Sequence, residues 1–469
     1  MTTALLLCLL VLGAIAALAG RRRARSFGAD RTVSLHSRPN QHAAFMAIAT
    51  ALPAMLLILG WSAFSGMVED RLVLDRFPDL ASGYSLPERE AFLRDARAIA
   101  GGGIVSFRDE AKEAAAVILG DIRSTTNAIL AIMVTVLAIG GFVLGYRALA
   151  PRFRARTHVE TTIRTGLLLA SAVAILTTIG IVFSLIFEAI RFFSIVPVSD
   201  FLFGLQWSPQ SAFRGAGAAA TGTDTTVFGA VPLFAGTLLI TFVAMLVAAP
   251  IGLMSAIYLS DYASSRIRGI AKPVMEILAG IPTVVYGFFA VLTIAPFFRG
   301  AGEAIGLSVA SESALAAGVV MGIMIIPFVS SLSDDVINAV PQSLRDGSAA
   351  MGATKSETIR KVVLPAALPG IVSALMLAVS SAIGETMIVV MAAGLAAPNL
   401  RTDPLAAFNP LEALTTVTVQ IVTLLVGDQE FDSAKTLAAF ALGLVLFVIT
   451  LILNVIALQV VKRYREAYD

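Results

Sequence analysis

The chain has 469 residues, of which 57% are hydrophobic and only 14% are charged. A soluble protein of this size carries about 25% charged residues, so the composition excludes a soluble globular protein and indicates an integral membrane protein. The formal net charge of +2 favours no charged partner such as nucleic acid. With Cys8 as the sole cysteine, neither a disulfide within the chain nor a cysteine-based metal site is expected.

Nine stretches are apolar enough to form membrane-spanning helices, each of which needs about 20 residues. They are residues 4–20, 44–66, 125–148, 165–190, 233–259, 274–297, 313–333, 368–394 and 437–461. A basic run follows the first stretch instead of preceding it, which favours a retained span over a cleaved signal peptide. The sequence therefore predicts an all-α polytopic membrane protein.

Basic loops predict the orientation of these spans. The loops rich in Lys and Arg are residues 21–43, 147–164, 260–273 and 334–367, together with the tail from residue 462. With nine spans, all five lie on one side, which the positive-inside rule assigns to the cytoplasm. We expect the N-terminus outside and the C-terminus in the cytoplasm.

The segments on the outer side differ in character. Residues 67–124 carry charges of both signs and are expected to form a small external cap of helices or a partly ordered loop. Residues 214–226 are small and are typical of a linker, because no Gly-Lys-Ser/Thr follows to make a phosphate-binding loop. Residues 414–426 form a half-length apolar piece, expected to lie at the interface or to enter the membrane partway.

The segment 341–365 places charged and small residues between two apolar spans on the cytoplasmic side. Ser343 is expected to cap a short helix with Asp346 in its first turn, and Gly352 to turn the chain. A second short helix is expected to end before Pro365, because proline disfavours helix in the residue before it. Two short helices at an angle would form a knob that fits a cleft on another protein.

Glu385 is the one acidic residue near the middle of a predicted span. A carboxylate at that depth costs about 2.5–3.5 kcal/mol on insertion scales and therefore usually faces a protein interior or an aqueous path. Ser380, Ser381 and Thr386 lie beside it and can donate hydrogen bonds to an oxyanion. The alternative is that Glu385 only holds helices together by a hydrogen bond or salt bridge.

Several features limit the chemistry that the chain itself can perform. It contains no Walker motif, so ATP hydrolysis is expected on a separate subunit if ATP drives the protein. No nucleophile–base pair or metal-ligand cluster supports an enzyme. Pro282 and Pro327 lie inside predicted spans, where each is expected to kink its helix.

The segment 341–365 resembles the cytoplasmic coupling loop of ABC importer permeases. The family pattern has Glu-Ala-Ala, then Gly, then Ile, then Leu-Pro at fixed spacing. The matching residues are Asp346, Gly347, Ser348, Gly352, Val362, Leu364 and Pro365. The resemblance implies that these residues, apart from Val362, form the contact for the ATPase.

The run Ile383-Gly384-Glu385-Thr386-Met387 is similar to the signature of phosphate-specific ABC permeases, as are residues 279–287 and 323–328. The Gly-Glu-Thr-Met form resembles the PstC type. The resemblance implies a type I ABC importer fold, with a six-span permease domain over residues 156–469. Residues 1–155 are then an N-terminal three-span extension. The family commonly has arginine where this chain has Ser381.

The resemblance also implies partners and a location. The partners are a second permease of the PstA type, two ATP-binding subunits and an external phosphate-binding protein. ATP and Mg would be bound by the ATPase and no cofactor by this chain, and the location would be the bacterial inner membrane. The tentative pathway residues are Glu385, Thr386, Ser381 and Ser380. Two alternatives stay open: import of another oxyanion, sulfate or molybdate, and a secondary transporter with Glu385 as a proton-linked site.

Overall fold

The computed structural model describes residues 2–28, 35–78, 86–103, 105, 108–209, 227–426 and 433–465. Regular structure in these ranges is helical, apart from one isolated bridge between Trp207 and Phe228. The chain forms two compact units, Met1–Leu176 and Thr177–Asp469. The chain passes from one unit to the other inside helix α6 (Ala155–Phe193). The predicted domain boundary after residue 155 stays a prediction, and the predicted linker 214–226 lies outside the described residues.

Nine helical segments of the described chain are long and apolar enough to cross a membrane. They are Thr2–Phe27, Pro39–Leu74, Glu110–Ala148, Ala155–Phe193, Val231–Tyr262, Thr283–Ala304, Ala314–Ala339, Lys355–Ile383 and Ala434–Val460. Each overlaps one of the nine predicted stretches, which confirms the prediction of an all-α polytopic membrane protein.

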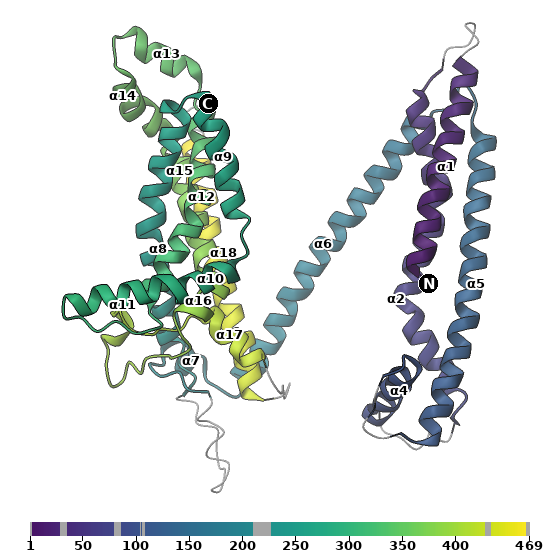
Figure 1. Ribbon diagram of the computed structural model, residues 1–469, viewed down its shortest axis with the longest axis horizontal. Coiled ribbons are helices and arrows are strands. Elements are labelled where there is room, and N and C mark those ends of the chain that lie inside the picture. Colours follow the sequence, from purple (N-terminus) through teal and green to yellow (C-terminus); the bar gives the residue numbers. More distant parts are fainter. Residues whose placement is uncertain are drawn as a thin grey trace. The chain divides into compact units, whose positions relative to one another are not determined.

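The first unit is a bundle of α1 (Thr2–Gly28), α2 (Pro39–Leu74) and α5 (Glu110–Ala148), which pack side by side (Figure 1). Their apolar faces meet in a core that contains the buried Leu9, Ile58 and Leu130. Burial of such faces is what stabilises helices beyond their intrinsic propensity.

The predicted external segment 67–124 contributes the ends of α2 and α5 together with α4 (Leu86–Ala100), which packs on α5. Buried Phe92 and Leu119 join these elements. The Arg123 Nε donates to Glu69 Oε2 at 2.8 Å, so the described part of this segment is held by both apolar and charged contacts.

The second unit is built on α8 (Val231–Ile257) and α12 (Ala314–Ala339), which form its most extensive helix pair. α15 (Leu364–Ile383) packs on α12, and α18 (Ala434–Arg465) packs on α15. The shorter elements are α7 (Val198–Phe203), η3 (Tyr258–Tyr262), α9 (Ser265–Ala279), α10 (Thr283–Phe289), η4 (Ala290–Ile294), α11 (Ala295–Ala304), α13 (Gln342–Ala350), α14 (Lys355–Thr358), η5 (Ile359–Val363), α16 (Met387–Ala392), η6 (Ala406–Phe408) and α17 (Val417–Leu425).

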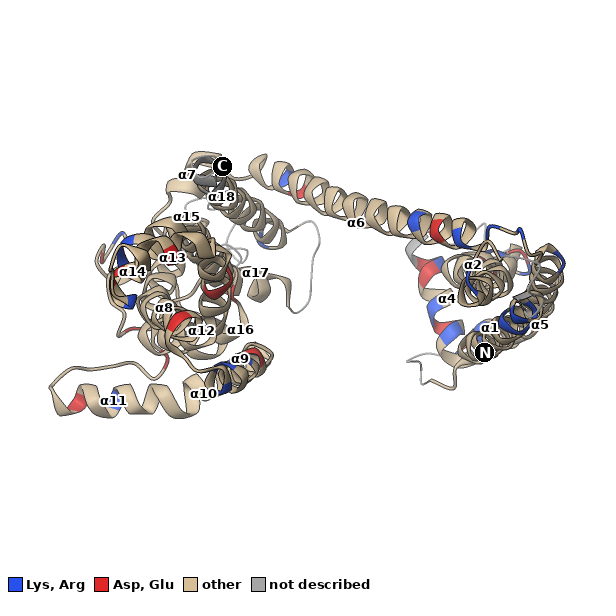
Figure 2. Ribbon diagram, turned by 90° about the horizontal axis from the view of Figure 1, so that it is seen from above, with Lys and Arg blue, Asp and Glu red and all other residues tan. Residues whose placement is uncertain are grey.

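Figure 1 shows α13 and α14 at one end of this unit, and α7, α11 and α17 toward the other. Seen from above in Figure 2, basic residues mark α9 and α14. Charged groups of the coupling stretch, residues 341–365, thus gather at one end of the long helices.

The prediction that residues 274–297 form one continuous helix is wrong, because two helices divide this stretch. α9 ends at Ala279, and Pro282 is the N-cap residue of α10 instead of a kink inside one helix. The Tyr286 hydroxyl donates to the Leu278 carbonyl across the break at 2.9 Å, which satisfies one of the carbonyls that the end of α9 leaves free. By contrast, Pro327 lies inside α12 as predicted.

The apolar piece 414–426 contains α17, which packs on α18 and α8. Val417, Val419 and Leu424 are almost completely buried within the unit. The Thr416 side chain caps the helix by accepting from the Val419 N–H. One face of this piece is therefore packed within the unit, and its predicted placement at the interface or partway into the membrane stays a prediction.

Candidate coupling and pathway sites

The coupling stretch forms the two short helices that the sequence predicts. α13 ends at Ala350, and Gly352 then adopts a φ of 85°, a left-handed conformation that glycine adopts without steric cost. Thr354 caps α14: its hydroxyl accepts from the Glu357 N–H, and the Glu357 carboxylate accepts from the Thr354 N–H at 3.0 Å. This reciprocal capping box fixes where the second helix begins.

The predicted cap of the first helix is wrong. Pro341 holds the N-cap position of α13, and Ser343 lies within the helix. Proline suits a helix start because it has no N–H to leave unpaired. Asp346 lies beyond the first turn and accepts from Gln342 Nε2 at 3.0 Å.

The predicted end of the second helix before Pro365 is also wrong. α14 passes into the π-helical turn η5, and η5 passes directly into α15, with Pro365 in the first turn of α15. Pro365 supplies no N–H, so one carbonyl of the preceding turn loses its helical donor without the helix ending. The second helix of the coupling stretch and the following span are therefore one continuous helical rod.

The outward surface of the coupling stretch is open. Methyl groups added at Gly347 and Gly352 would meet nothing within 4 Å, and Met351 is 88% exposed. The inner side is tied together, because the hydroxyls of Ser348 and Thr358 lie 2.9 Å apart and join α13 to α14. An exposed surface with small side chains allows another protein to approach closely.

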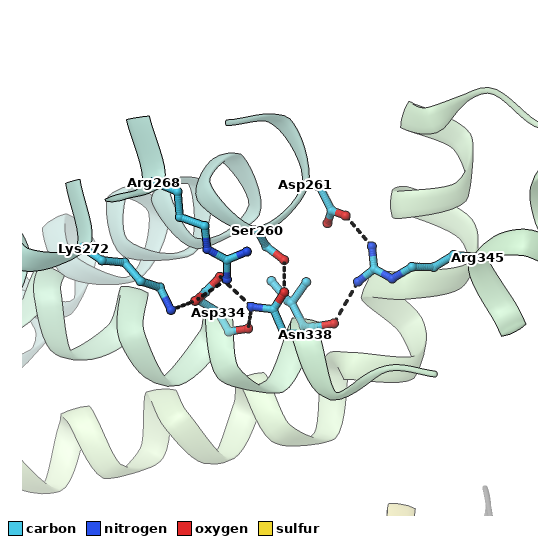
Figure 3. Close-up of polar contacts among 8 residues, drawn as sticks. Ser260, Asp261, Arg268, Lys272, Asp334, Asn338 and Arg345 are labelled. Carbon is cyan, nitrogen blue, oxygen red and sulfur yellow. Dashed lines mark hydrogen bonds and ion pairs between the residues drawn. The ribbon is translucent and has the colours of Figure 1, made fainter. Parts of the chain in front are cut away.

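A cluster of paired charges lies near the C-terminal end of α12, and its residues were not singled out from the sequence. Asp334 is 1% exposed and accepts from both Arg268, at 3.2 Å to each oxygen, and Lys272 (Figure 3). The Asn338 amide donates to the same carboxylate at 2.9 Å. Because Arg268 and Lys272 belong to α9, these bonds hold α9 against α12 (Figure 3). In the sequence, Arg268 and Lys272 stand out only as part of the basic loop 260–273, which predicts orientation.

A second ion pair lies beside this cluster and joins Arg345 of α13 to Asp261 of η3 (Figure 3). The Arg345 guanidinium also donates to the Ile337 carbonyl at 2.8 Å. A cavity of about 650 Å³ opens between η3 and the coupling stretch, lined by both members of this pair. The inner face of the stretch is therefore polar and attached to the membrane helices.

The structure places Glu385 at a break between two helices, so the predicted continuous span 368–394 is wrong. α15 ends at Ile383, and α16 begins at Met387. The Glu385 carboxylate accepts from the Met387 N–H at 2.9 Å and from the Ile388 N–H at 3.3 Å. These bonds partly compensate the cost of half-burying a carboxylate, since N–H groups at a helix start favour negative charge.

Buried hydroxyl groups support the break at Glu385. The Thr418 hydroxyl of α17 donates to the Glu385 carbonyl at 2.8 Å and lies 3.0 Å from the Thr416 hydroxyl. The Thr237 hydroxyl of α8 accepts from the Val417 N–H at 3.1 Å. These threonines were not singled out from the sequence, although their clustering in residues 415–418 is a visible signal.

The four predicted pathway residues lie in one short segment. Ser380 is half-buried and Ser381 exposed in the last turn of α15, and Thr386 is half-buried in the break with Glu385. Within the described residues, no cation forms an ion pair with Glu385. Ser381 holds the position of the family arginine, and the role of these residues in a pathway stays a prediction.

Family models match both parts of the chain. Residues 6–177 are similar to a family described as a phosphate ATP-binding cassette transporter. Residues 248–466 are similar to a family described as the binding-protein-dependent transport system inner membrane component.

Individual relatives match mainly the second part. The probable ABC transporter permease protein YqgH of Bacillus subtilis is 34% identical over 289 residues, 61% of this chain and 83% of the relative. The phosphate transport system permease protein PstC 1 of Mycobacterium tuberculosis is 31% identical, over 56% of this chain and 81% of the relative. The phosphate transport system permease protein PstC of Mesorhizobium japonicum is 32% identical, over 51% and 75%.

Proposed function

Because the chain belongs to the family of binding-protein-dependent transport system inner membrane components, we propose that it is the permease subunit of an ATP-driven phosphate importer. The observation that carries this proposal is the similarity to two proteins named phosphate transport system permeases, over 81% and 75% of their lengths. The nine candidate spans agree with a component that crosses the membrane many times.

The coupling stretch is proposed to receive the ATPase. Its open surface presents Asp346, Gly347 and Gly352, whose small or acidic side chains permit a close contact, and Ser348 supports it from the inner side. Leu364 and Pro365 then begin α15, so a force applied at α14 passes along one helix toward the break at Glu385.

Transport follows from a change in the relative stability of two conformations. ATP binding on a separate subunit favours one opening of the pathway, and hydrolysis favours the other. Glu385, Thr386, Ser381 and Ser380 are proposed to line the pathway near its middle. A carboxylate would repel phosphate, so we expect Glu385 to act on the opening of the pathway and the hydroxyls to contact the anion.

The proposal includes a complete assembly. A second permease of the PstA type would form the other half of the pathway, two ATP-binding subunits would carry ATP and Mg, and an external binding protein would deliver phosphate. The chain would lie in the bacterial inner membrane with its N-terminus outside and its C-terminus in the cytoplasm, as the basic loops indicate.

The proposal is tested by purifying the chain with its bound partners, reconstituting the purified complex in vesicles and measuring uptake of labelled phosphate. We expect an ATPase with a Walker motif to copurify, and uptake to require ATP and to resist excess sulfate or molybdate. Inhibition of phosphate uptake by sulfate or molybdate would indicate that this anion, and not phosphate, is the substrate. Uptake driven by a proton gradient without ATP would instead support a secondary transporter.

The coupling stretch is tested by removing residues 347–355 in the same assay. We expect the ATPase to dissociate and uptake to stop, because this deletion removes the open surface. Uptake at the level of the unaltered protein would refute the role assigned to the stretch. A deletion of equal length in residues 86–94 of α4 serves as the control for general damage.

A further inference from the structure

We infer that Asp261 and Arg345 are positioning residues for coupling: they attach α13 to the α8–α12 helix pair, so that movement of the coupling stretch reaches this pair as well as α15. This inference rests on the proposed function. It adds a second mechanical connection to the continuous rod that η5 and α15 provide.

Arg345 is the side chain through which α13 is held to the membrane helices. α13 has no buried residue, so apolar packing contributes little to its position. The Arg345 guanidinium contacts Asp261 of η3 and donates to the Ile337 carbonyl of α12 at 2.8 Å. One planar guanidinium therefore binds two different helical segments at once, a geometry that lysine does not reproduce.

Asp261 depends on Arg345 in return. Its side chain is 8% exposed, and that of Arg345 is 17% exposed. One carboxylate oxygen meets Arg345, and the other is buried with no hydrogen-bond partner in the described part of the chain. Removing Arg345 would thus leave a buried carboxylate without compensation, which is strongly unfavourable. The Asp261–Arg345 ion pair is expected to stay intact unless a large force acts on α13.

The helix pair to which Arg345 is attached is closely packed. Methyl groups added at Gly252, Gly318 and Gly322 would each come within about 2.8 Å of the opposite helix, so α8 and α12 are in close contact at three levels. The Ser260 hydroxyl of η3 also donates to Asn338 Oδ1 of α12 at 3.1 Å. Displacement of η3 by Arg345 is therefore transmitted to α12.

The cluster on Asp334 extends this attachment to α9. Asn338 donates both to the Asp334 carboxylate, at 2.9 Å, and to the Asp334 carbonyl, at 2.7 Å. Arg268 and Lys272 complete the link from α12 to α9 (Figure 3). Arg345 is thus connected to a continuous network of polar contacts that spans η3, α12 and α9, and displacement of Arg345 would act on all three.

The test uses the full chain in its assembled transporter, reconstituted in vesicles. The measured quantity is labelled phosphate taken up per ATP hydrolysed, together with the amount of assembled complex. Asp261→Arg and Arg345→Asp each place like charges together, and the double variant restores an opposite pair. Arg345→Met is a milder variant that keeps much of the apolar stem. Exchange of Arg156 and Glu160, an exposed pair on α6, is the matched control.

Each single charge reversal is expected to lower the phosphate taken up per ATP by about tenfold, within the range for directly coupled residues. The double variant should recover most of this loss, while the control exchange leaves the ratio unchanged. Arg345→Met should lower the ratio in the same direction.

An unchanged ratio in Arg345→Met and in both reversals would overturn the inference. So would uptake that falls only in proportion to the amount of assembled complex, because that result identifies a purely structural pair. Failure of the unaltered protein to take up phosphate with ATP would instead refute the proposed function.

Discussion

Two carboxylates in the second unit, Asp334 and Glu385, are stabilised in different ways. Asp334 is almost fully buried and is neutralised by two cations from another helix. Glu385 is half-buried, forms no ion pair within the described residues and accepts two N–H groups of its own chain. The first arrangement fixes helices together, whereas the second leaves a negative charge available at a helix break. The difference indicates that the partners of a carboxylate, more than its burial, separate a fixed attachment from an available charge.

The largest effect is expected from removing the cations of Asp334. The double variant Arg268→Met and Lys272→Met leaves a buried carboxylate unpaired and should lower the free energy of unfolding by about 3–5 kcal/mol. Denaturation of the purified chain in detergent measures this change. Arg266→Met, an exposed position on the same helix, should change stability by less than about 0.5 kcal/mol. Equal effects of the two substitutions would show that the cluster is not a fixed attachment.

A smaller effect on stability but a clear effect on transport is expected at Glu385. Glu385→Gln keeps a carbonyl oxygen for the two N–H groups, so unfolding should change little. Uptake should fall by about tenfold, equivalent to about 1.4 kcal/mol, because the charge is lost. Glu385→Ala also removes the acceptor and should cost a further 1 kcal/mol or so in stability, about the value of a helix cap. Normal uptake by the Gln variant would make Glu385 structural, like Asp334.

The smallest effect is expected at Thr418, which supports the break without touching the carboxylate. Thr418→Val keeps the shape and removes the hydrogen bonds with the Glu385 carbonyl and the Thr416 hydroxyl, at a cost of about 1 kcal/mol. The same denaturation measurement detects it. Thr423→Val on the same helix also loses a bond, to its own helix, and is the matched control. A loss no greater than that of the control would mean that the break does not need Thr418.

Hydropathy predicts the spans of this chain well, because about 20 apolar residues are needed wherever a helix crosses a membrane. The two short helices of the coupling stretch were also predictable, since Gly352 and the Thr354–Glu357 box act locally. Such signals depend on backbone preferences of a few neighbouring residues and need no knowledge of the rest of the fold.

The breaks near Pro282 and Glu385 were not predictable in this way. At each break a side-chain hydroxyl donates to a free backbone carbonyl. Tyr286 donates to the Leu278 carbonyl at the first break, and Thr418 donates to the Glu385 carbonyl at the second. Thr418 lies 33 residues away along the chain. The cluster on Asp334 also joins residues that are 66 positions apart. Contacts of this kind are set by helix packing, which a single sequence does not reveal.

The π-helical turn η5 has a consequence for angular register. An α-helix advances by about 100° per residue, so one extra residue in a turn rotates everything beyond it by that angle. Deleting one residue of Ile359–Val363 would convert the turn toward α-helix and rotate α14 about the axis of α15. Thr358 of α14 would then turn away from Ser348 of α13, although every residue of α13 and α14 is unchanged. The orientation of α14 against α13 is thus set by one extra residue in η5.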